Sequence, residues 1–158
     1  MDAILQLNQP APDFTLRNQY NAPITLSQID AQFIVIFTFT KACGDICTAQ
    51  ALALADMNDA IKVQGGIILG IGTESPSILK EWHNAHHFPF DLLSDPDHAV
   101  LSAYDAWESF TFKGHTHESP IRTYAIVDRQ RTLLSFEKRI TIDMCIRGIS
   151  RALNLSVA

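Results

Sequence analysis

Phe39-Thr-Lys-Ala-Cys-Gly-Asp-Ile-Cys-Thr-Ala-Gln50 is the stretch that decides the fold, because it sets two cysteines four positions apart between a strand-like run and a helical pattern. The run before it, residues 33–39, is apolar, β-branched and aromatic, and its length is typical of a central strand. After it, apolar residues recur at positions 51, 54, 57 and 61, which predicts a helix over residues 47–63. Cys47 therefore falls at the start of the predicted helix.

A thiol at a helix N-terminus is a candidate nucleophile. Unpaired N–H groups and the positive end of the helix dipole stabilise a thiolate there, so Cys47 is the predicted reactive residue. Four helical residues rise about 6 Å, which is within the Cα separation that a disulfide tolerates, so a reversible disulfide with Cys43 is feasible. Either cysteine could instead be an inert small hydrophobe. Cys145 shares an apolar stripe with Ile149 and Leu153 and is expected in the core.

Length and composition indicate one soluble domain over residues 1–158. The chain is 47% hydrophobic and 18% charged, which is ordinary for a compact protein. A net charge of −5 with scattered charges argues against nucleic acid or an anionic membrane as a partner. The N-terminal residues show neither a secretory signal nor a membrane span, so we expect a cytoplasmic location. In a reducing compartment, cysteines are more often catalytic or metal-binding than structural.

Predicted strands and helices alternate along the chain. Extended segments at 13–16 and 24–26 precede a strand at 33–39, the helix at 47–63, a strand at 66–71, a helix at 75–86, a strand at 90–93 and a helix at 97–106. A polar loop over 108–120 leads to strands at 123–127 and 133–136 and a final helix at 141–153. Such alternation predicts an α/β fold with a central mixed sheet covered by helices on both faces.

Several of these segments resemble the peroxiredoxins of the alkyl-hydroperoxide-reductase and thiol-specific-antioxidant (AhpC/TSA) family, nearest the bacterioferritin-comigratory type. The resemblance covers almost the whole chain and implies the peroxiredoxin variant of the thioredoxin-like fold. It rests on Ala11-Pro-Asp-Phe-Thr-Leu16, Ile24-Thr-Leu-Ser27, Cys47-Thr-Ala-Gln50, Leu92-Leu-Ser-Asp-Pro-Asp97, Ala103-Tyr-Asp-Ala-Trp107 and Arg122-Thr-Tyr-Ala-Ile-Val-Asp128.

The resemblance implies a thiol peroxidase that needs no cofactor or metal. Cys47 would reduce hydrogen peroxide or alkyl hydroperoxides through a sulfenic acid, while Arg122 favours the thiolate and stabilises the departing negative charge. Cys43 is a candidate for resolving the sulfenic acid to a disulfide, which a thioredoxin-like or small-thiol reductant would reopen. The chain would act as a monomer or homodimer.

The motif around Cys47 departs from the family pattern at three positions. The family has a proline seven residues before its reactive cysteine and a threonine or serine three residues before it. Here those positions hold Thr40 and Gly44, so Thr40 is the candidate for the hydroxyl function that Gly44 lacks. The resolving cysteine that many relatives carry five residues later is replaced by Leu52.

Two alternatives remain open at this point. Thr40-Lys-Ala-Cys-Gly-Asp-Ile-Cys47 is also similar to the Cys-x-x-x-Cys loop of the Sco-type copper proteins. That resemblance implies a Cu(I) site built from Cys43, Cys47 and a distant histidine, for which His117, with His115 beside it, is the candidate. The other alternative is a thiol–disulfide oxidoreductase that uses both cysteines without strong peroxidase activity.

Overall fold

The central element is β3 (Phe33–Thr38), which is buried along its whole length. The structure is a computed structural model of the chain and describes residues 5–155. Because successive side chains of a strand point to opposite faces, β3 supplies both cores: Phe33, Val35 and Phe37 on one face, Ile34 and Ile36 on the other. This explains why its sequence shows no polar alternation.

Seven strands form one mixed sheet in the order β2-β1-β5-β4-β3-β8-β9. β3 runs parallel to β4 (Gly66–Gly72), which runs parallel to β5 (Asp91–Ser94). β8 (Thr123–Asp128) is antiparallel to β3, and β9 (Leu133–Lys138) is antiparallel to β8. At the other edge, β1 (Thr15–Asn18) pairs antiparallel with β5 and with β2 (Pro23–Thr25), which a 3-10 turn at Leu26–Gln28 follows.

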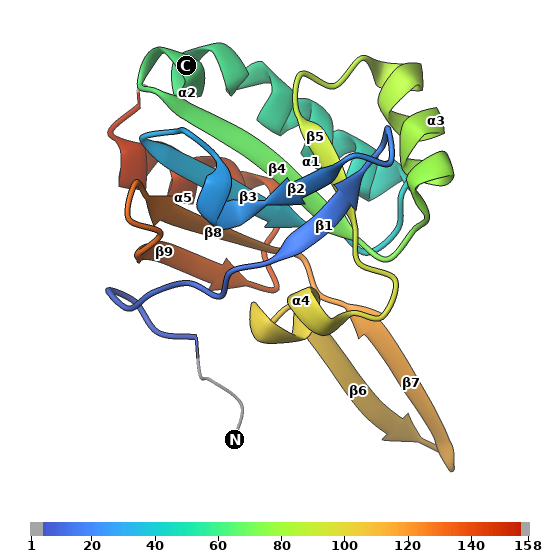
Figure 1. Cartoon of the computed structure of the whole chain (residues 1–158). Coiled ribbons are helices and arrows are strands. Elements are labelled where there is room, and N and C mark those ends of the chain that lie inside the picture. The colour runs from blue at the N-terminus through green and yellow to red at the C-terminus, as the bar shows by residue number, and fades with distance from the viewer. Residues whose placement is uncertain (1–4, 156–158) are drawn as a thin grey trace.

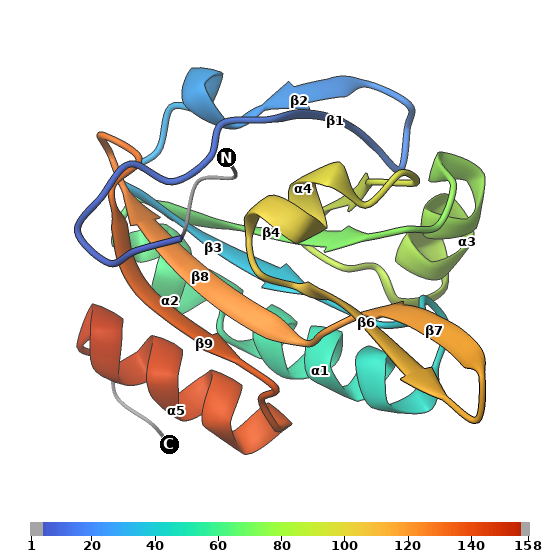
Figure 2. The same cartoon turned by 90° about the horizontal axis from the view of Figure 1, so that it is seen from below.

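Helices cover both faces of this sheet, as predicted. Figure 2 shows α1 (Asp45–Asp56), α2 (Asn58–Val63) and α5 (Ile142–Leu153) below the sheet and α4 (Ala99–Ala103) above it. α3 (Pro76–His86) packs Leu79 and Trp82 into the same core as α1 and α5. No helix within residues 5–155 is long and apolar enough to cross a membrane.

The predicted helix over 47–63 is wrong in its bounds. It begins at Asp45, two residues earlier, and Met57 divides it into α1 and α2. Asp56 precedes the break and Asn58 follows it. Such side chains compete for backbone hydrogen bonds and favour helix ends. The helix predicted over 97–106 is also shorter and covers only Ala99–Ala103, after His98 in a left-handed conformation.

The predicted loop over 108–120 is a second correction, because this segment forms a hairpin. β6 (Trp107–Phe112) pairs with β7 (His115–Pro120), and the hairpin projects from the body of the molecule (Figure 1). Lys113 and Gly114 form its two-residue turn and both have positive φ, at 51° and 77°. That combination is typical of the tight turn whose twist matches two antiparallel strands.

Candidate active site

Cys47 lies in the first turn of α1, directly after the loop that leaves β3. The residue is only 2% exposed and belongs to the core cluster that also contains Trp82 of α3 and Cys145 of α5. Gly44 is the N-cap residue of α1 and provides no side-chain cap, so the first N–H groups of the helix are not used by a capping side chain. Asp45 is exposed at the surface of the first turn. The thiol therefore lies in the first helical turn, where no side chain caps the backbone N–H groups.

Thr40 is the polar neighbour of this sulfur. Its Oγ1 lies 3.3 Å from the Cys47 Sγ, within hydrogen-bonding distance for a sulfur atom. Thr40 is half-buried at the end of β3, seven residues before the cysteine that it contacts. Either group can be the donor in this contact, so the Thr40 hydroxyl provides the Cys47 sulfur with a hydrogen-bonding partner.

A polar clamp brings Arg122 to the same end of the sheet. The Thr38 hydroxyl donates to the carbonyl of Ile121 at 2.6 Å and accepts from the backbone N–H of Thr123 at 2.9 Å. Thr38 and Thr123 are also register partners in the β3–β8 ladder. Arg122, between the two bonded backbone groups, is therefore held opposite the end of β3 from which Thr40 extends.

Thr40 and Arg122 line one pocket of about 410 Å³. Glu108 and Arg139 also line it and are paired with each other at 2.6 Å. Arg122 is half-buried, and it makes no ion pair with any carboxylate of residues 5–155. Its guanidinium can therefore bind an anionic or polarised oxygen that enters beside Thr40.

Cys43 lies outside this buried arrangement. Its side chain is exposed, and its backbone has a left-handed φ of 67°. Both Cys43 and Cys47 are free thiols. Sequence spacing identified the two cysteines, but the structure does not place them as a bonded pair.

Cys145 occupies the core, as predicted. It is fully buried on α5, and burial raises the pKa of its thiol to about 12. A thiol that stays protonated at neutral pH is a poor nucleophile. Cys145 therefore acts as a packing residue.

The histidines proposed for copper lie on the projecting hairpin. His115 and His117 are exposed on β7, and the His117 ring stacks on Phe110 at 5.2 Å. Among residues 5–155, no three or more His, Cys, Asp or Glu side chains are grouped so that they could hold a metal ion. The copper alternative therefore finds no support in the arrangement of these side chains.

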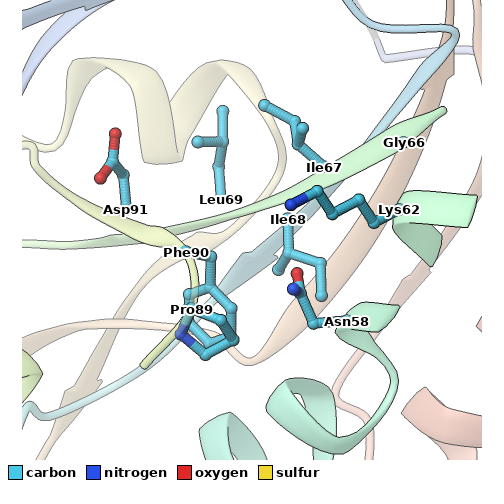
Figure 3. A pocket seen from close by; sticks show the side chains of 9 residues that line it. All are labelled: Asn58, Lys62, Gly66, Ile67, Ile68, Leu69, Pro89, Phe90 and Asp91. Carbon is cyan, nitrogen blue, oxygen red and sulfur yellow. The ribbon is translucent and has the colours of Figure 1, made fainter. Parts of the chain in front are cut away.

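A separate pocket lies at the other end of β4, where the strand begins. Figure 3 shows Asn58 and Lys62 of α2 on one side of it and Phe90 on the other, with aliphatic side chains of β4 between them. Cys47 follows the opposite end of the neighbouring parallel strand β3. None of the residues that line this pocket carries a thiol or an imidazole, so it has no group suited to thiol chemistry.

Sequence reasoning missed two side chains that contact the active-site segment. The Glu74 carboxylate accepts a hydrogen bond from the backbone N–H of Ala42 at 2.7 Å. The Trp82 indole donates to the Thr48 hydroxyl at 3.0 Å, next to Cys47. In each of these two pairs, the bonded residues are more than thirty positions apart in the sequence. No motif or periodicity connects positions so distant, and only the packing of α3 beside α1 reveals the contacts.

Comparison with known proteins places this arrangement in a family. The model of the AhpC/TSA family matches residues 7–135 of this chain. Peroxiredoxin Bcp of Escherichia coli K12 is 32% identical over 124 residues, which cover 78% of this chain and 80% of that protein. Peroxiredoxin Bcp of Bacillus subtilis is 22% identical and spans 87% of this chain and 88% of its own.

Solved structures agree with the fold. The bacterioferritin comigratory protein of Xanthomonas campestris superimposes with a TM-score of 0.86 at 20% identity, covering 97% of this chain and 98% of that one. BcpB of Mycobacterium tuberculosis gives a TM-score of 0.82 at 20% identity and covers 98% of this chain and all of its own. These likenesses confirm the peroxiredoxin variant of the thioredoxin-like fold. The chain belongs to the AhpC/TSA family and is a peroxiredoxin of the Bcp type.

Proposed function

We propose that this thiol-dependent peroxidase reduces hydroperoxides at Cys47. The Cys47 thiolate attacks one peroxide oxygen, and the O–O bond breaks as the S–O bond forms. The second oxygen leaves with its electron pair and takes a proton, so the products are Cys47 sulfenic acid and water or an alcohol. The sulfur is oxidised by two electrons and the peroxide is reduced by two.

The contact between the Thr40 hydroxyl and the Cys47 sulfur carries this proposal. It puts a hydrogen-bond donor on the sulfur at a helix N-terminus, beside a pocket that Arg122 also lines. Cys47 does not itself line this pocket, so Thr40 is the residue that joins the sulfur to it. Attack on an O–O bond requires a thiolate and is helped by a nearby cation, because negative charge develops on the leaving oxygen. Arg122 and Thr40 are therefore assigned to stabilise that charge and to hold the peroxide.

The substrates proposed are hydrogen peroxide and alkyl hydroperoxides. The structural study of the Xanthomonas campestris relative concerns its alkyl peroxide reduction activity, which supports the second class for this chain. Cys43 is the proposed resolving residue: its thiol condenses with the sulfenic acid, forming the disulfide and releasing water. A thioredoxin-like or small-thiol reductant would then restore both thiols by exchange. The cytoplasmic location and the monomeric or dimeric state stay predictions from the sequence.

The test is a single-turnover reaction of anaerobically reduced protein with one equivalent of hydrogen peroxide or an alkyl hydroperoxide. Thiol loss and intact mass are followed with time. Wild type should lose two hydrogens, Cys43→Ser should gain one oxygen, and Cys47→Ser should consume no peroxide. If Cys47→Ser keeps wild-type peroxide consumption, the assignment of Cys47 is wrong. A wild-type rate no faster than that of a free thiol would remove the proposed activity.

A further inference from the structure

Cys43 and Cys47 lie in environments that keep them apart in the reduced protein. Cys47 is 2% exposed within a formed helical turn, whereas Cys43 is exposed one residue before the helix N-cap. A disulfide needs both Cβ atoms to point toward each other at a short distance. An inward-facing and an outward-facing side chain do not meet this requirement, so the loop between β3 and α1 must rearrange before Cys43 reaches Cys47.

Two hydrogen bonds donated by backbone N–H groups hold the loop in its present conformation. The Gly44 N–H donates to the Lys41 carbonyl at 3.2 Å and closes a tight turn. The Ala42 N–H donates to Glu74 Oε2 at 2.7 Å, and the Ala42 side chain is buried. Cys43 follows with its left-handed φ of 67°. A non-glycine residue persists in that conformation only where its surroundings fix it.

Glu74 is well placed to fix the loop. It lies between β4 and α3, and its own backbone carbonyl accepts a hydrogen bond from the Ser94 hydroxyl at 2.6 Å. Its Oε1 is buried and has no hydrogen-bond partner among the described residues. The bond to Ala42 is therefore the contact that compensates this carboxylate for its loss of water, and a bond to a charged acceptor is stronger than one between neutral groups.

We propose that Glu74 is a positioning residue that holds the loop of Cys43 in its reduced conformation and so controls when Cys43 can bond to Cys47. This inference rests on the proposed roles of the two cysteines. In the reduced protein the carboxylate binds the Ala42 N–H and keeps Cys47 free for peroxide. When the disulfide forms, the loop leaves this position and the bond between Glu74 and Ala42 breaks. The Cys43 thiol attacks the sulfur of the Cys47 sulfenic acid: the S–S bond forms as the S–O bond breaks, and the oxygen takes a proton and leaves as water. The two electrons that this oxidation requires passed to the peroxide when the sulfenic acid formed.

Thiol–disulfide equilibrium measures the effect of this contact without any peroxide. Wild type and variants are equilibrated with mixtures of reduced and oxidised dithiothreitol, which donates or accepts the two electrons and two protons. The fraction of Cys43–Cys47 disulfide is read by acid quench, alkylation and mass. Because only the reduced state has the Glu74 contact, Glu74→Ala should raise the equilibrium constant for disulfide formation about tenfold, from the worth of one charge-assisted hydrogen bond.

Two further variants separate this role from general loosening of the fold. Glu74→Gln keeps an oxygen acceptor but loses the charge, so its equilibrium constant should fall between wild type and Glu74→Ala. Ser75→Ala removes the neighbouring cap of α3, which bonds to the Ile78 N–H and does not contact the loop, and should stay within about twofold of wild type. If Glu74→Ala fails to fold, the comparison of Glu74→Gln with Ser75→Ala still decides the question.

The kinetics give a second readout. Trp82, bonded to Thr48 beside Cys47, should report the rearrangement as a change in fluorescence, and Cys43→Ser should abolish the phase that follows sulfenic acid formation. Glu74→Ala should accelerate this second phase several-fold and leave the peroxide-dependent first phase in place. Equal disulfide equilibria in wild type, Glu74→Ala and Glu74→Gln would overturn the role of Glu74. A normal effect in dithiothreitol with no reaction toward peroxide would overturn the peroxidase assignment alone.

Discussion

Replacing Thr40 with valine tests the contact on which the site is built. Valine keeps the branched shape of threonine at the end of β3 and removes only the hydroxyl that lies 3.3 Å from the Cys47 Sγ. A hydrogen bond to a charged group contributes about 1.5–3 kcal/mol, and sulfur is a weak acceptor, so we take about 1.5 kcal/mol. That corresponds to about a tenfold fall in the second-order rate constant for hydrogen peroxide at pH 7.

The assay is stopped-flow consumption of hydrogen peroxide in a Cys43→Ser background, where the disulfide step does not contribute. Thr40→Ser restores a hydroxyl and should recover most of the wild-type rate. Thr116→Val, on the exposed hairpin, is the matched control and should not change it. The melting temperatures of wild type, Thr40→Val and Thr116→Val should agree, because valine keeps the branched shape of threonine at both positions.

Two results would refute this reasoning. Equal rates for Thr40→Val and wild type would mean that the hydroxyl stabilises neither the thiolate nor the transition state. A Thr40→Ser variant as slow as Thr40→Val would mean that the methyl group of Thr40, rather than its hydroxyl, matters for Cys47.

Three further perturbations test the fold around the site. Burial raises the pKa of Cys145 to about 12, so above pH 9 the unfolded chain loses this proton while the folded protein keeps it. The free energy of unfolding should therefore fall by about 1.4 kcal/mol per pH unit from pH 9 to pH 12. Urea titrations should show a shallower loss in Cys145→Ala, and parallel curves would contradict this. Gly148→Ala adds a Cβ that overlaps the Tyr124 hydroxyl, so the free energy of unfolding should fall by about 1–3 kcal/mol, and an unchanged urea midpoint would be inconsistent with this packing. Gly114→Val places a β-branched residue at a φ of 77° and should weaken the hairpin by about 1–3 kcal/mol, seen as faster amide exchange in β6 and β7 with unchanged peroxide kinetics; unaltered exchange would contradict the turn geometry.

The order of strands and helices in the main sheet was predictable because burial shapes the sequence. The fully buried β3 and the apolar stripe of α5 appear directly in the residue pattern. The hairpin at 107–120 was missed because both of its faces are largely exposed, so its strands lack the apolar alternation that burial imposes. Its one local signal was the Lys113-Gly114 pair, whose two positive φ angles make a tight turn.

The candidate site was predictable only in part, for a different reason. Cys47 and Cys43 are revealed by local spacing, and Arg122 by resemblance to relatives. The Thr40 contact depends on how the chain turns between β3 and α1, and the Glu74 contact depends on where the loop before α3 lies. Such long-range and turn-dependent geometry leaves no period in a single sequence.

Two of the three departures from the family motif, at positions 40 and 44, should compensate each other because Thr40 offers a hydroxyl in place of the one that Gly44 lacks. A proline at position 40 would offer no donor, and a hydroxyl at position 44 would then be needed; here Thr40 contacts the sulfur and position 44 can be glycine. Gly44→Thr should therefore restore much of the peroxide rate lost in Thr40→Val while changing the wild-type rate little. The added Cβ would lie 3.1 Å from the Lys41 carbonyl oxygen, so the turn must shift by a few tenths of an ångström, which a small loss in melting temperature should record. Rate effects that simply add in the double variant would show that the two positions act independently, and the exchange of roles would then be wrong.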